Sequence, residues 1–408
     1  METRTLLKEA ALDAERIAAD RRALHAHPGT GFDIPFAVDY VMQSLRESGL
    51  SPQRCGQAGI TALAGGKKPG RVFLLRADMD ALPMQEASGV PFASEIPGRM
   101  HACGHDLHTA MLLEAARLLK RHEAELEGTV KLMFQPAEEI FQGSSDMVRA
   151  GVLENPHVDA ALMIHVAPGM PFPAGTVIAC DGGVSAAACD TFTVTVTGKG
   201  CHGSMPHQGI DPITPACAMV TALQEIPARE MSMQDEAALT VGCFQAGGAA
   251  NVIPDTAGFS GTLRTFDEEL RTQIKDRLEE LVTAIGAAYR TQVSVSWTSS
   301  CPTLYNDPAL AACIPGYLQE LEGLPGCWTV AQLNAGTGKA QKGTGSEDFA
   351  YISRQVPSLM LALAAGTPAD GYIYPQHHPQ VRFDEACLVP GSAVYAQAAI
   401  RWLEEHGL

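Results

Sequence analysis

The segment MHACGHDLH, residues 100–108, concentrates side chains that can bind a metal ion or take part in acid–base chemistry. They are His101, Cys103, His105, Asp106 and His108. Cys103 and His105 are one residue apart, directly before an apolar stretch that predicts a helix. In a tight turn before a helix, such a pair can direct a thiolate and an imidazole at one point, as metal binding requires. A buried thiol beside a helix-capping histidine would leave the same pattern.

Further candidate ligands lie at the ends of separate apolar runs. Glu138 and Glu139 end the run VKLMFQPAEE, where adjacent carboxylates repel each other and lose hydration unless a cation is near. His165 ends an apolar run, and His377 begins the sequence HHP near the C-terminus. Each alone fits a solvated turn, a hydrogen-bonded core histidine or a surface histidine. Together they favour a metal centre.

The elements that must position these residues follow an α/β pattern from residue 2 to about 187. Helical stretches alternate with the apolar runs RVFLLRADMD at 71, GTVKLMFQPAEE at 128 and DAALMIHV at 159. Apolar runs separated by helices are typical of strands buried on both faces of a mostly parallel sheet. Such sheets bind ligands at the carboxyl ends of their strands, and all three runs end in candidate donors. The pattern resumes with PSLMLALAAG near 357 and closes with a helix from about Gly391 to His406.

Between residues 188 and 301 the pattern changes. DTFTVTVTG alternates threonine with apolar residues, as a half-exposed strand does. A helix at about 212–228, the strands ALTVGCFQAG and DTAGFSGTLRTF, a helix at about 267–289 and the strand QVSVSW follow. This β-α-β-β-α-β order predicts an inserted, ferredoxin-like unit. We therefore expect a discontinuous catalytic domain of residues 1–187 and 302–408, and an inserted domain of residues 188–301.

Length, charge and cysteine content narrow the function classes. A chain of 408 residues favours two compact units, and a net charge of −17 argues against nucleic acid or an anionic membrane as a partner. Among the 11 cysteines no two form a C-x-x-C pair, which argues against a disulfide framework and a ribbon-type zinc site. The N-terminus lacks the apolar core of a signal peptide, and the longest apolar run, residues 359–365, is too short to cross a membrane. We expect a cytoplasmic protein that acts on small molecules.

A series of short motifs resembles the M20 metallopeptidase clan. The matching segments, between HAHP at 25 and HHP at 377, are MHACGHDLHTA, QPAEE, IHVAPGMPFPAGTV, GKGCHGSMPH, NVIPD, GTLRTF and GSEDFAY. They are most similar to its amidohydrolase branch, which includes hippurate hydrolase, auxin-conjugate hydrolases and N-acyl-amino-acid deacylases. The resemblance implies an α/β metallohydrolase domain with an inserted lid through which two chains dimerise. It also implies that the substrate is an N-acyl amino acid or a related small amide.

The resemblance further implies roles for particular residues. Two divalent ions per subunit, whether manganese, zinc, cobalt or nickel, would be bound by Cys103, His105, Glu139, His165 and His377. Glu138 would be the general base toward a metal-activated water, and Asp80 would orient a metal-site residue without binding metal. His202 would reach across the dimer to stabilise the oxyanion, while Asn251 and Arg264 would hold the substrate. Without the resemblance, Asp80 could cap a turn and Arg264 could be a surface residue.

Several departures from the family pattern surround the expected site. Residues 29–33 read GTGFD where the family usually has ELGFE, and Cys201 replaces a common glycine beside His202. Phe141 and Gln142 stand where glycines often follow the paired glutamates. No predicted ligand is lost, so we expect an altered substrate pocket in a working enzyme.

Two other function classes stay open at this point. A metal-independent thiol acyl hydrolase would use Cys103 as the nucleophile, paired with His105 or His101. A non-catalytic binding protein would keep the same scaffold without the reaction. The pair Glu138–Glu139 argues against the thiol enzyme, which has no use for these carboxylates. The retained base Glu138 argues against a protein that only binds.

Overall fold

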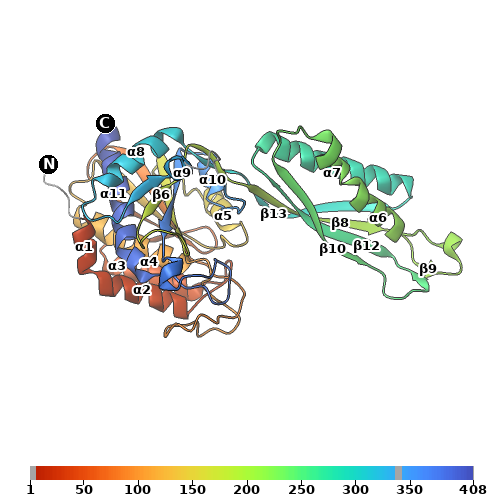
Figure 1. Cartoon of the computed structure of the whole chain (residues 1–408), viewed down its shortest axis with the longest axis horizontal. Helices are drawn as coiled ribbons and strands as arrows, with labels where there is room; N and C mark the ends of the chain where they lie inside the picture. The colour runs from red at the N-terminus through yellow and green to blue at the C-terminus, as the bar shows by residue number, and fades with distance from the viewer. Residues whose placement is uncertain (1–5, 336–341, 408) are drawn as a thin grey trace. The chain divides into compact units, whose positions relative to one another are not determined.

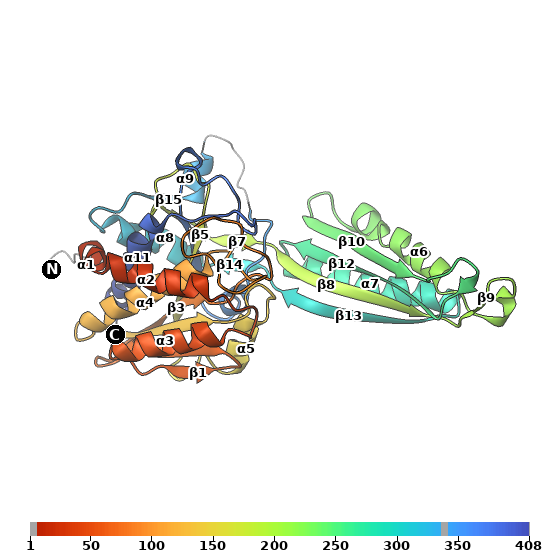
Figure 2. The same cartoon turned by 90° about the horizontal axis from the view of Figure 1, so that it is seen from below.

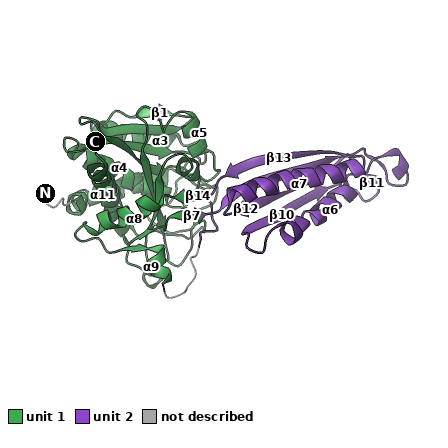
Figure 3. Cartoon of the chain, turned by 90° about the horizontal axis from the view of Figure 1, so that it is seen from above, with its two compact units in different colours: residues 1–185, 305–341, 347–408 green, residues 186–304, 342–346 purple. Residues whose placement is uncertain are grey.

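The computed structural model describes residues 6–335 and 342–407, and the chain forms two compact units (Figure 3). Unit 1 comprises residues 1–185, 305–341 and 347–408, and unit 2 comprises residues 186–304 and 342–346. The expected inserted domain, residues 188–301, falls within unit 2. None of the described helices has the length and apolar character needed to cross a membrane.

Unit 1 is built on an eight-stranded sheet in the order β1-β2-β4-β3-β5-β16-β6-β15 (Figures 1 and 2). The strands are β1 (Gln53–Cys55), β2 (Gly59–Gly65), β3 (Arg71–Asp78), β4 (Gly128–Gln135), β5 (Ala160–Ala167), β6 (Val177–Ala179), β15 (Cys327–Thr329) and β16 (Ser358–Ala364). The central strands pair in parallel, β4 with β3, β3 with β5 and β5 with β16. The prediction of an α/β fold with a mostly parallel sheet is confirmed.

Helices cover this sheet, and α4 is the most deeply buried of them. The helices of unit 1 are α1 (Leu6–Leu12), α2 (Ala14–Ala26), α3 (Pro35–Glu47), α4 (His105–Arg121), α5 (Gly143–Arg149), α8 (Pro308–Gln319), α9 (Val330–Asn334), α10 (Ala350–Ser353) and α11 (Leu388–His406). Every residue of α4 from His105 to Leu119 is buried, and the helix packs against α2, α11 and β3. The strands β3, β4 and β5 are buried almost throughout, which explains why their sequences are continuous apolar runs.

Unit 2 is a four-stranded antiparallel sheet with two long helices. Its main elements are β8 (Ala188–Thr197), α6 (Ile213–Ala222), β10 (Ala237–Ala246), β12 (Thr256–Thr265), α7 (Glu268–Ala288) and β13 (Gln292–Cys301). The strand order β10-β12-β8-β13 confirms the predicted ferredoxin-like lid. A small two-stranded antiparallel sheet of β9 (Cys201–His202) and β11 (Val252–Ile253) extends from it.

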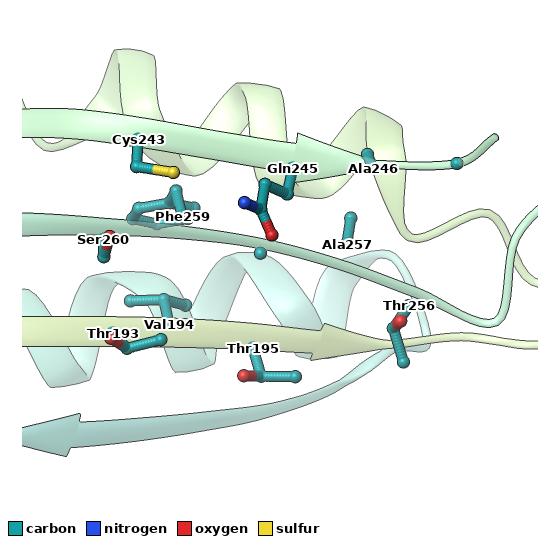
Figure 4. Close-up of a pocket in the computed structure, with 12 residues that line it drawn as sticks. Thr193, Val194, Thr195, Cys243, Gln245, Ala246, Thr256, Ala257, Phe259 and Ser260 are labelled. Atoms are coloured by element: carbon teal, nitrogen blue, oxygen red, sulfur yellow. The ribbon is translucent and has the colours of Figure 1, made fainter.

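The two faces of the lid sheet differ, as the alternating sequence of β8 predicts. Phe192, Val194 and Val196 point toward α6 and α7 and form an apolar core with residues of those helices. Thr193 and Thr195 alternate with them and therefore lie on the opposite face. That face carries a hollow of about 480 Å³ lined by uncharged residues of β8, β10 and β12 (Figure 4).

Two local details differ from the sequence-based expectation. The helix expected at about 212–228 ends at Ala222, and a separate π-helical turn follows at Ile226–Glu230. This turn contains Pro227, which has no N–H to continue a regular helical ladder. His105 was expected just before a helix but is the first residue of α4, because Gly104 adopts a left-handed conformation (φ 91°) as its N-cap. A Cβ at Gly104 would lie 2.4 Å from a methyl of Val166, so only glycine fits there.

Candidate metal centre

Side chains from segments far apart in the sequence meet at the carboxyl edge of β3, β4 and β5. Parallel strands end at the same edge of a sheet, so residues at and after their last positions are brought together. Glu138 and Glu139 follow β4, and His165 lies two residues before the end of β5. His105 begins α4 after the loop that carries Cys103. His377 comes from the loop that precedes α11.

The five predicted metal ligands form two groups that share Cys103. In one group Cys103, His105 and His165 have ligand atoms within 4.8 Å of one another, and the other consists of Cys103, Glu139 and His377. The Cys103 Sγ atom lies 3.3 Å from His377 Nε2 and 3.7 Å from His165 Nε2. Glu139 lies between the groups, with its carboxylate oxygens 3.9 Å from His105 Nε2 and 3.6 Å from His377 Nε2.

His105 and His165 each form a hydrogen bond through Nδ1, which leaves Nε2 of each imidazole available to the ligand groups. His105 Nδ1 donates to the main-chain oxygen of Asp80 at 2.8 Å, and His165 Nδ1 donates to that of Val166 at 2.9 Å. Within residues 6–335 and 342–407, His105 Nε2 and Glu139 Oε1 are buried without a hydrogen-bond partner. Buried polar atoms are rarely left unsatisfied, and these two face each other across 3.9 Å. A cation bound between them would satisfy both, so the residues present fit a metal ion.

The charge of the site also calls for a cation. Asp78, Asp80 and Glu138 are almost completely buried, and of these three Asp78 pairs with Arg76, at 2.7 Å. Burial, together with the neighbouring carboxylates, raises the pKa of Glu138 well above its ordinary value. Burial raises the pKa of Glu139 to about 7. Such shifts mark carboxylates that lack positive charge nearby, which two divalent ions would supply.

Both carboxylate oxygens of Asp80 contact the backbone of the predicted base and of its neighbouring ligand. Its Oδ1 accepts a hydrogen bond from the backbone N–H of Glu138 at 2.9 Å, and its Oδ2 accepts one from that of Glu139 at 3.2 Å. The two glutamates lie in a turn bounded by Ala137 and Phe141, both with left-handed backbone (φ 54° and 55°). Non-glycine residues adopt this conformation at a cost, so the turn needs the support that Asp80 gives.

Glu138 is placed beside the ligand groups. Its Oε1 lies 3.4 Å from the backbone nitrogen of Asp348, which donates to it, and its Oε2 lies 4.0 Å from His105 Nε2. The residue is almost fully buried, and its neighbour Glu139 belongs to a ligand group. A carboxylate in this position can take a proton from a water held among the ligands and release it again.

The remaining donors of MHACGHDLH make other contacts. Asp106 accepts hydrogen bonds from Arg21 Nε at 2.7 Å and from His25 Nδ1 at 2.8 Å. His108 Nδ1 contacts Asp78 at 2.6 Å, while its Nε2 accepts the backbone N–H of Val166 at 2.9 Å. Both nitrogens of His108 are therefore used. It supports the site through Asp78 and is not available as a ligand.

Arg76, Glu347 and Asp348 are part of this site although their roles were not predicted. Arg76 donates to Asp78 at 2.7 Å, to Glu347 at 2.9 Å and to Asp348 at 3.1 Å. The segments RADMD and GSEDFAY both stand out in the sequence. Nothing in the sequence shows that Arg76 on β3 contacts the pair Glu347–Asp348, which is more than half the chain away.

The environment of Cys103 is unsuited to a free thiol nucleophile. Burial raises the pKa of the Cys103 thiol although the neighbouring His105 opposes this shift, whereas an activated thiol needs a lowered pKa. Burial lowers the pKa of His101 to about 3, so this histidine does not carry the positive charge that would stabilise a thiolate.

His378, the other histidine of the HHP sequence, stacks on the ring of Tyr374 at 4.5 Å between centroids.

His202 and Asn251, two of the predicted lid residues, lie at the small β9–β11 sheet of unit 2. His202 ends β9, and its Nδ1 accepts hydrogen bonds from the backbone N–H of Ser204 at 3.1 Å and from its hydroxyl at 2.8 Å. A neutral His202 then carries its proton on Nε2, which is left to donate. Asn251 is exposed beside it, and its carbonyl accepts the backbone N–H of Gly203 at 2.8 Å.

Arg264 lies toward the other end of the same sheet. It is the next-to-last residue of β12, about 27 Å along the strand from Thr256, where β12 begins just after β11. The structure therefore does not bring Arg264 together with His202 and Asn251 within one lid. Its Nη1 donates to the carbonyl of Thr344 at 3.0 Å and to the hydroxyl of Ser346 at 3.3 Å.

The loop that departs from the family pattern contacts the turns that carry the predicted base. The carbonyl of Gly29 accepts the backbone N–H of Ala81 at 2.8 Å, and that of Gly31 accepts the N–H of Ala137 at 3.1 Å. Ala81 follows Asp80, and Ala137 precedes Glu138. Changes in this loop therefore border the site without replacing one of its ligands.

Comparison with known proteins places this geometry in a family. A family model described as peptidase family M20/M25/M40 matches residues 74–401. The chain is 36% identical over 392 residues to an N-acetyl-L-cysteine deacetylase of Bacillus subtilis, covering 95% of this chain and 88% of that protein. It is 34% identical over 391 residues to IAA-amino acid hydrolase ILR1-like 4 of Arabidopsis thaliana, covering 94% of this chain and 85% of that one.

A solved structure supports the same relationship. The YXEP protein of Bacillus subtilis, described as a dinuclear metal binding peptidase from the M20 family, superimposes with a TM-score of 0.77 at 32% sequence identity. The match covers 97% of this chain and 99% of that one.

Proposed function

Because the chain belongs to peptidase family M20/M25/M40 and is a metal-dependent amidohydrolase, we propose that it removes the acyl group from N-acyl amino acids. The observation that carries the proposal is the pair of ligand groups that share Cys103, with Glu138 beside them. An amide is a weak electrophile with a poor leaving group. Its hydrolysis requires an activated water, a polarised carbonyl and a proton for the departing amine, and this arrangement can provide all three.

We propose that Cys103, His105, Glu139, His165 and His377 hold two divalent ions. When bound, such ions would lower the pKa of a water and withdraw charge from the substrate carbonyl. Burial lowers the pKa of both His165 and His377, so these imidazoles are neutral and able to bind a cation. Thiolate and imidazole suit zinc and cobalt, nickel is compatible with the imidazoles, and the carboxylate also suits manganese.

Glu138 is the proposed general base. Its position beside the ligand groups allows it to take the proton of the attacking water and deliver that proton to the amide nitrogen. Asp80 is the proposed orienting residue, since it binds the backbone of Glu138 and Glu139 and the hydrogen bond of His105 ends on its carbonyl.

The lid residues are proposed to bind the substrate. His202 would donate from Nε2 to the substrate carbonyl oxygen as negative charge develops there. Asn251 lies beside His202 at the β9–β11 sheet. Arg264 would bind the carboxylate of the amino acid. The separation of Arg264 from His202 and Asn251 within one lid supports a homodimer in which the β9–β11 sheet of one lid completes the site of the other chain.

The names of the relatives guide the choice of substrate class. One relative is named a deacetylase of N-acetyl-L-cysteine and another a hydrolase of amino acid conjugates of IAA. Both names describe an amide between an acyl group and an amino acid. The unusual loop at residues 29–33 is compatible with a different preference within this class.

The proposal is tested by release of free amino acid from N-acetyl, N-benzoyl, indole-acetyl and long-chain N-acyl amino acids. Chelator-treated protein is assayed with and without added manganese, zinc, cobalt or nickel. We expect turnover of at least one N-acyl amino acid that depends on added metal, and less turnover of the matching amide without an α-carboxylate. Equal rates on the acid and its amide would contradict the substrate class. Turnover that survives complete metal removal would contradict the reaction.

A further inference from the structure

The side chain of Gln376 lies against the metal centre from outside the ligand groups. Gln376 precedes His377 in the loop before α11 and is half-buried. Its Nε2 lies 3.1 Å from the carbonyl oxygen of Cys103 and 3.2 Å from that of Val166. A carbonyl oxygen only accepts hydrogen bonds, so the nitrogen of the amide, and not its oxygen, must face this pair.

The same nitrogen also approaches the sulfur shared by the two ligand groups. Gln376 Nε2 lies 3.6 Å from Cys103 Sγ and 3.4 Å from His165 Nδ1. His165 Nδ1 already donates its own proton to Val166, so it does not accept one from the amide. A cysteine that binds metal does so as a thiolate, which is a strong acceptor. The amide nitrogen carries two N–H groups, and three acceptors surround it: Cys103 Sγ and the carbonyl oxygens of Cys103 and Val166. Cys103 Sγ therefore shares one N–H with one of the two carbonyl oxygens.

The backbone beside Gln376 shows that the loop is docked at this point. His377 has a left-handed backbone (φ 62°), which is costly for a residue other than glycine. Its N–H donates to the carbonyl of Ala102 at 3.0 Å, one residue before the carbonyl that Gln376 contacts. Two successive residues of this loop thus bind two successive residues of the Cys103 segment.

We propose that Gln376 is a positioning residue of the metal centre that donates an N–H to the Cys103 thiolate and docks His377 against it. This inference rests on the proposed function, because it requires Cys103 to be a metal ligand. A hydrogen bond to a ligating sulfur stabilises its lone pairs and reduces the charge it gives to the metal. Because Cys103 belongs to both ligand groups, one amide influences both ions. Outer-sphere partners of this kind typically change metal affinity about 10–100-fold.

The test uses the full chain loaded with cobalt, whose bond to a thiolate gives a charge-transfer absorption in the near ultraviolet. Gln376→Met keeps the length of the side chain but cannot donate. We expect this band to move to longer wavelength because the sulfur lone pairs are no longer stabilised. We expect the cobalt affinity, measured by competition with a chelator, to fall about 10–100-fold because His377 is no longer docked against the site. Gln376→Asn, which keeps the amide but draws it back from the sulfur, is expected to move the band in the same direction. It also covers the case in which the methionine variant does not fold.

Gln380→Met is the matched control, because Gln380 lies in the same loop and is exposed. Its band and cobalt affinity should equal those of the unmodified protein. A residue that only stabilised the loop would alter the melting temperature without moving the band. An unmoved band and unchanged affinity in both Gln376 variants would overturn the inference while leaving the metal centre intact. Absence of a thiolate band in the unmodified protein would overturn the ligand assignment as well, so the two failures are distinguishable.

Discussion

Replacing Asp80 by asparagine tests whether this residue orients the site without binding metal. The Asp80 carboxylate accepts the backbone N–H groups of Glu138 and Glu139, one on each oxygen. Asparagine keeps one oxygen but places an NH₂ group opposite the other N–H. The hydrogen bond from His105 ends on the main-chain oxygen of residue 80 and is unaffected by the change.

The size of the effect follows from the bond that is lost. A hydrogen bond to a charged group contributes about 1.5–3 kcal/mol, and each 1.4 kcal/mol corresponds to a factor of about ten. The turn that carries the glutamates is bounded by Ala137 and Phe141 in left-handed conformations, which are costly and must be held by contacts such as these. We therefore expect Asp80→Asn to lower kcat/KM about 10–100-fold. At saturating metal, it should still bind as many ions as the unmodified protein.

The assay combines steady-state hydrolysis with metal content measured by elemental analysis after gel filtration in metal-containing buffer. Asp159→Asn is the matched control, because Asp159 also accepts a backbone N–H, that of Val72 at 2.8 Å, but at the opposite end of β3. Its kcat/KM should be unchanged. Loss of one equivalent of metal in Asp80→Asn would show that Asp80 is a ligand. Activity within about twofold of the unmodified protein, well below the 10–100-fold expected, would show that the two backbone contacts do not position the base.

Three further predictions follow from other contacts. Cys103→Ser should weaken the binding of both ions, because both ligand groups contain this sulfur. Calorimetric titration with zinc measures the two affinities, and weakening of only one would contradict the prediction. Asp190→Asn should lower the unfolding free energy of the lid by about 3–5 kcal/mol in urea titrations at neutral pH, since the buried carboxylate binds Arg271 at 2.6 and 2.9 Å. Burial opposes the charge, but Arg271 holds the pKa of Asp190 below its ordinary value, so this stability is present above about pH 4 and is lost as the pH falls through the folded pKa. Burial raises the pKa of Glu114 to about 7, so unfolding free energy should fall as the pH rises from about 4.5 to 7, and Glu114→Gln should flatten that slope; an unchanged slope would contradict the assignment.

Much of the fold could be predicted because its local and overall signals agree. The parallel strands β3, β4 and β5 are buried on both faces, and such strands are necessarily continuous apolar runs. The lid strand β8 is buried on one face, and it alternates. The early end of α6 was not predicted, because the apolar pattern continues through Pro227 although the regular helix does not.

Site residues could be predicted from the sequence only where the residue type and its position at the end of an apolar segment indicate a ligand. Cys103, the glutamate pair and His165 stand out because polar donors end apolar segments. The supporting groups carry no such signal. Arg76 occupies an inward position of a buried strand, where an arginine is unusual but its partners 347 and 348 cannot be inferred from spacing. Gln376 is an ordinary loop glutamine in the sequence, and only the fold places it beside Cys103.

The most direct test of the account compares Glu138→Gln with the unmodified protein after chelation and reloading with zinc or manganese. Glutamine keeps the shape of the side chain but cannot accept the proton of a water. The account predicts that the variant binds two ions per chain and binds the N-acyl amino acid substrate, while kcat falls by at least the 10²–10⁴-fold typical of a lost general base. Undiminished turnover in a fully loaded Glu138→Gln protein, or turnover in unmodified protein shown to contain no metal, would contradict it.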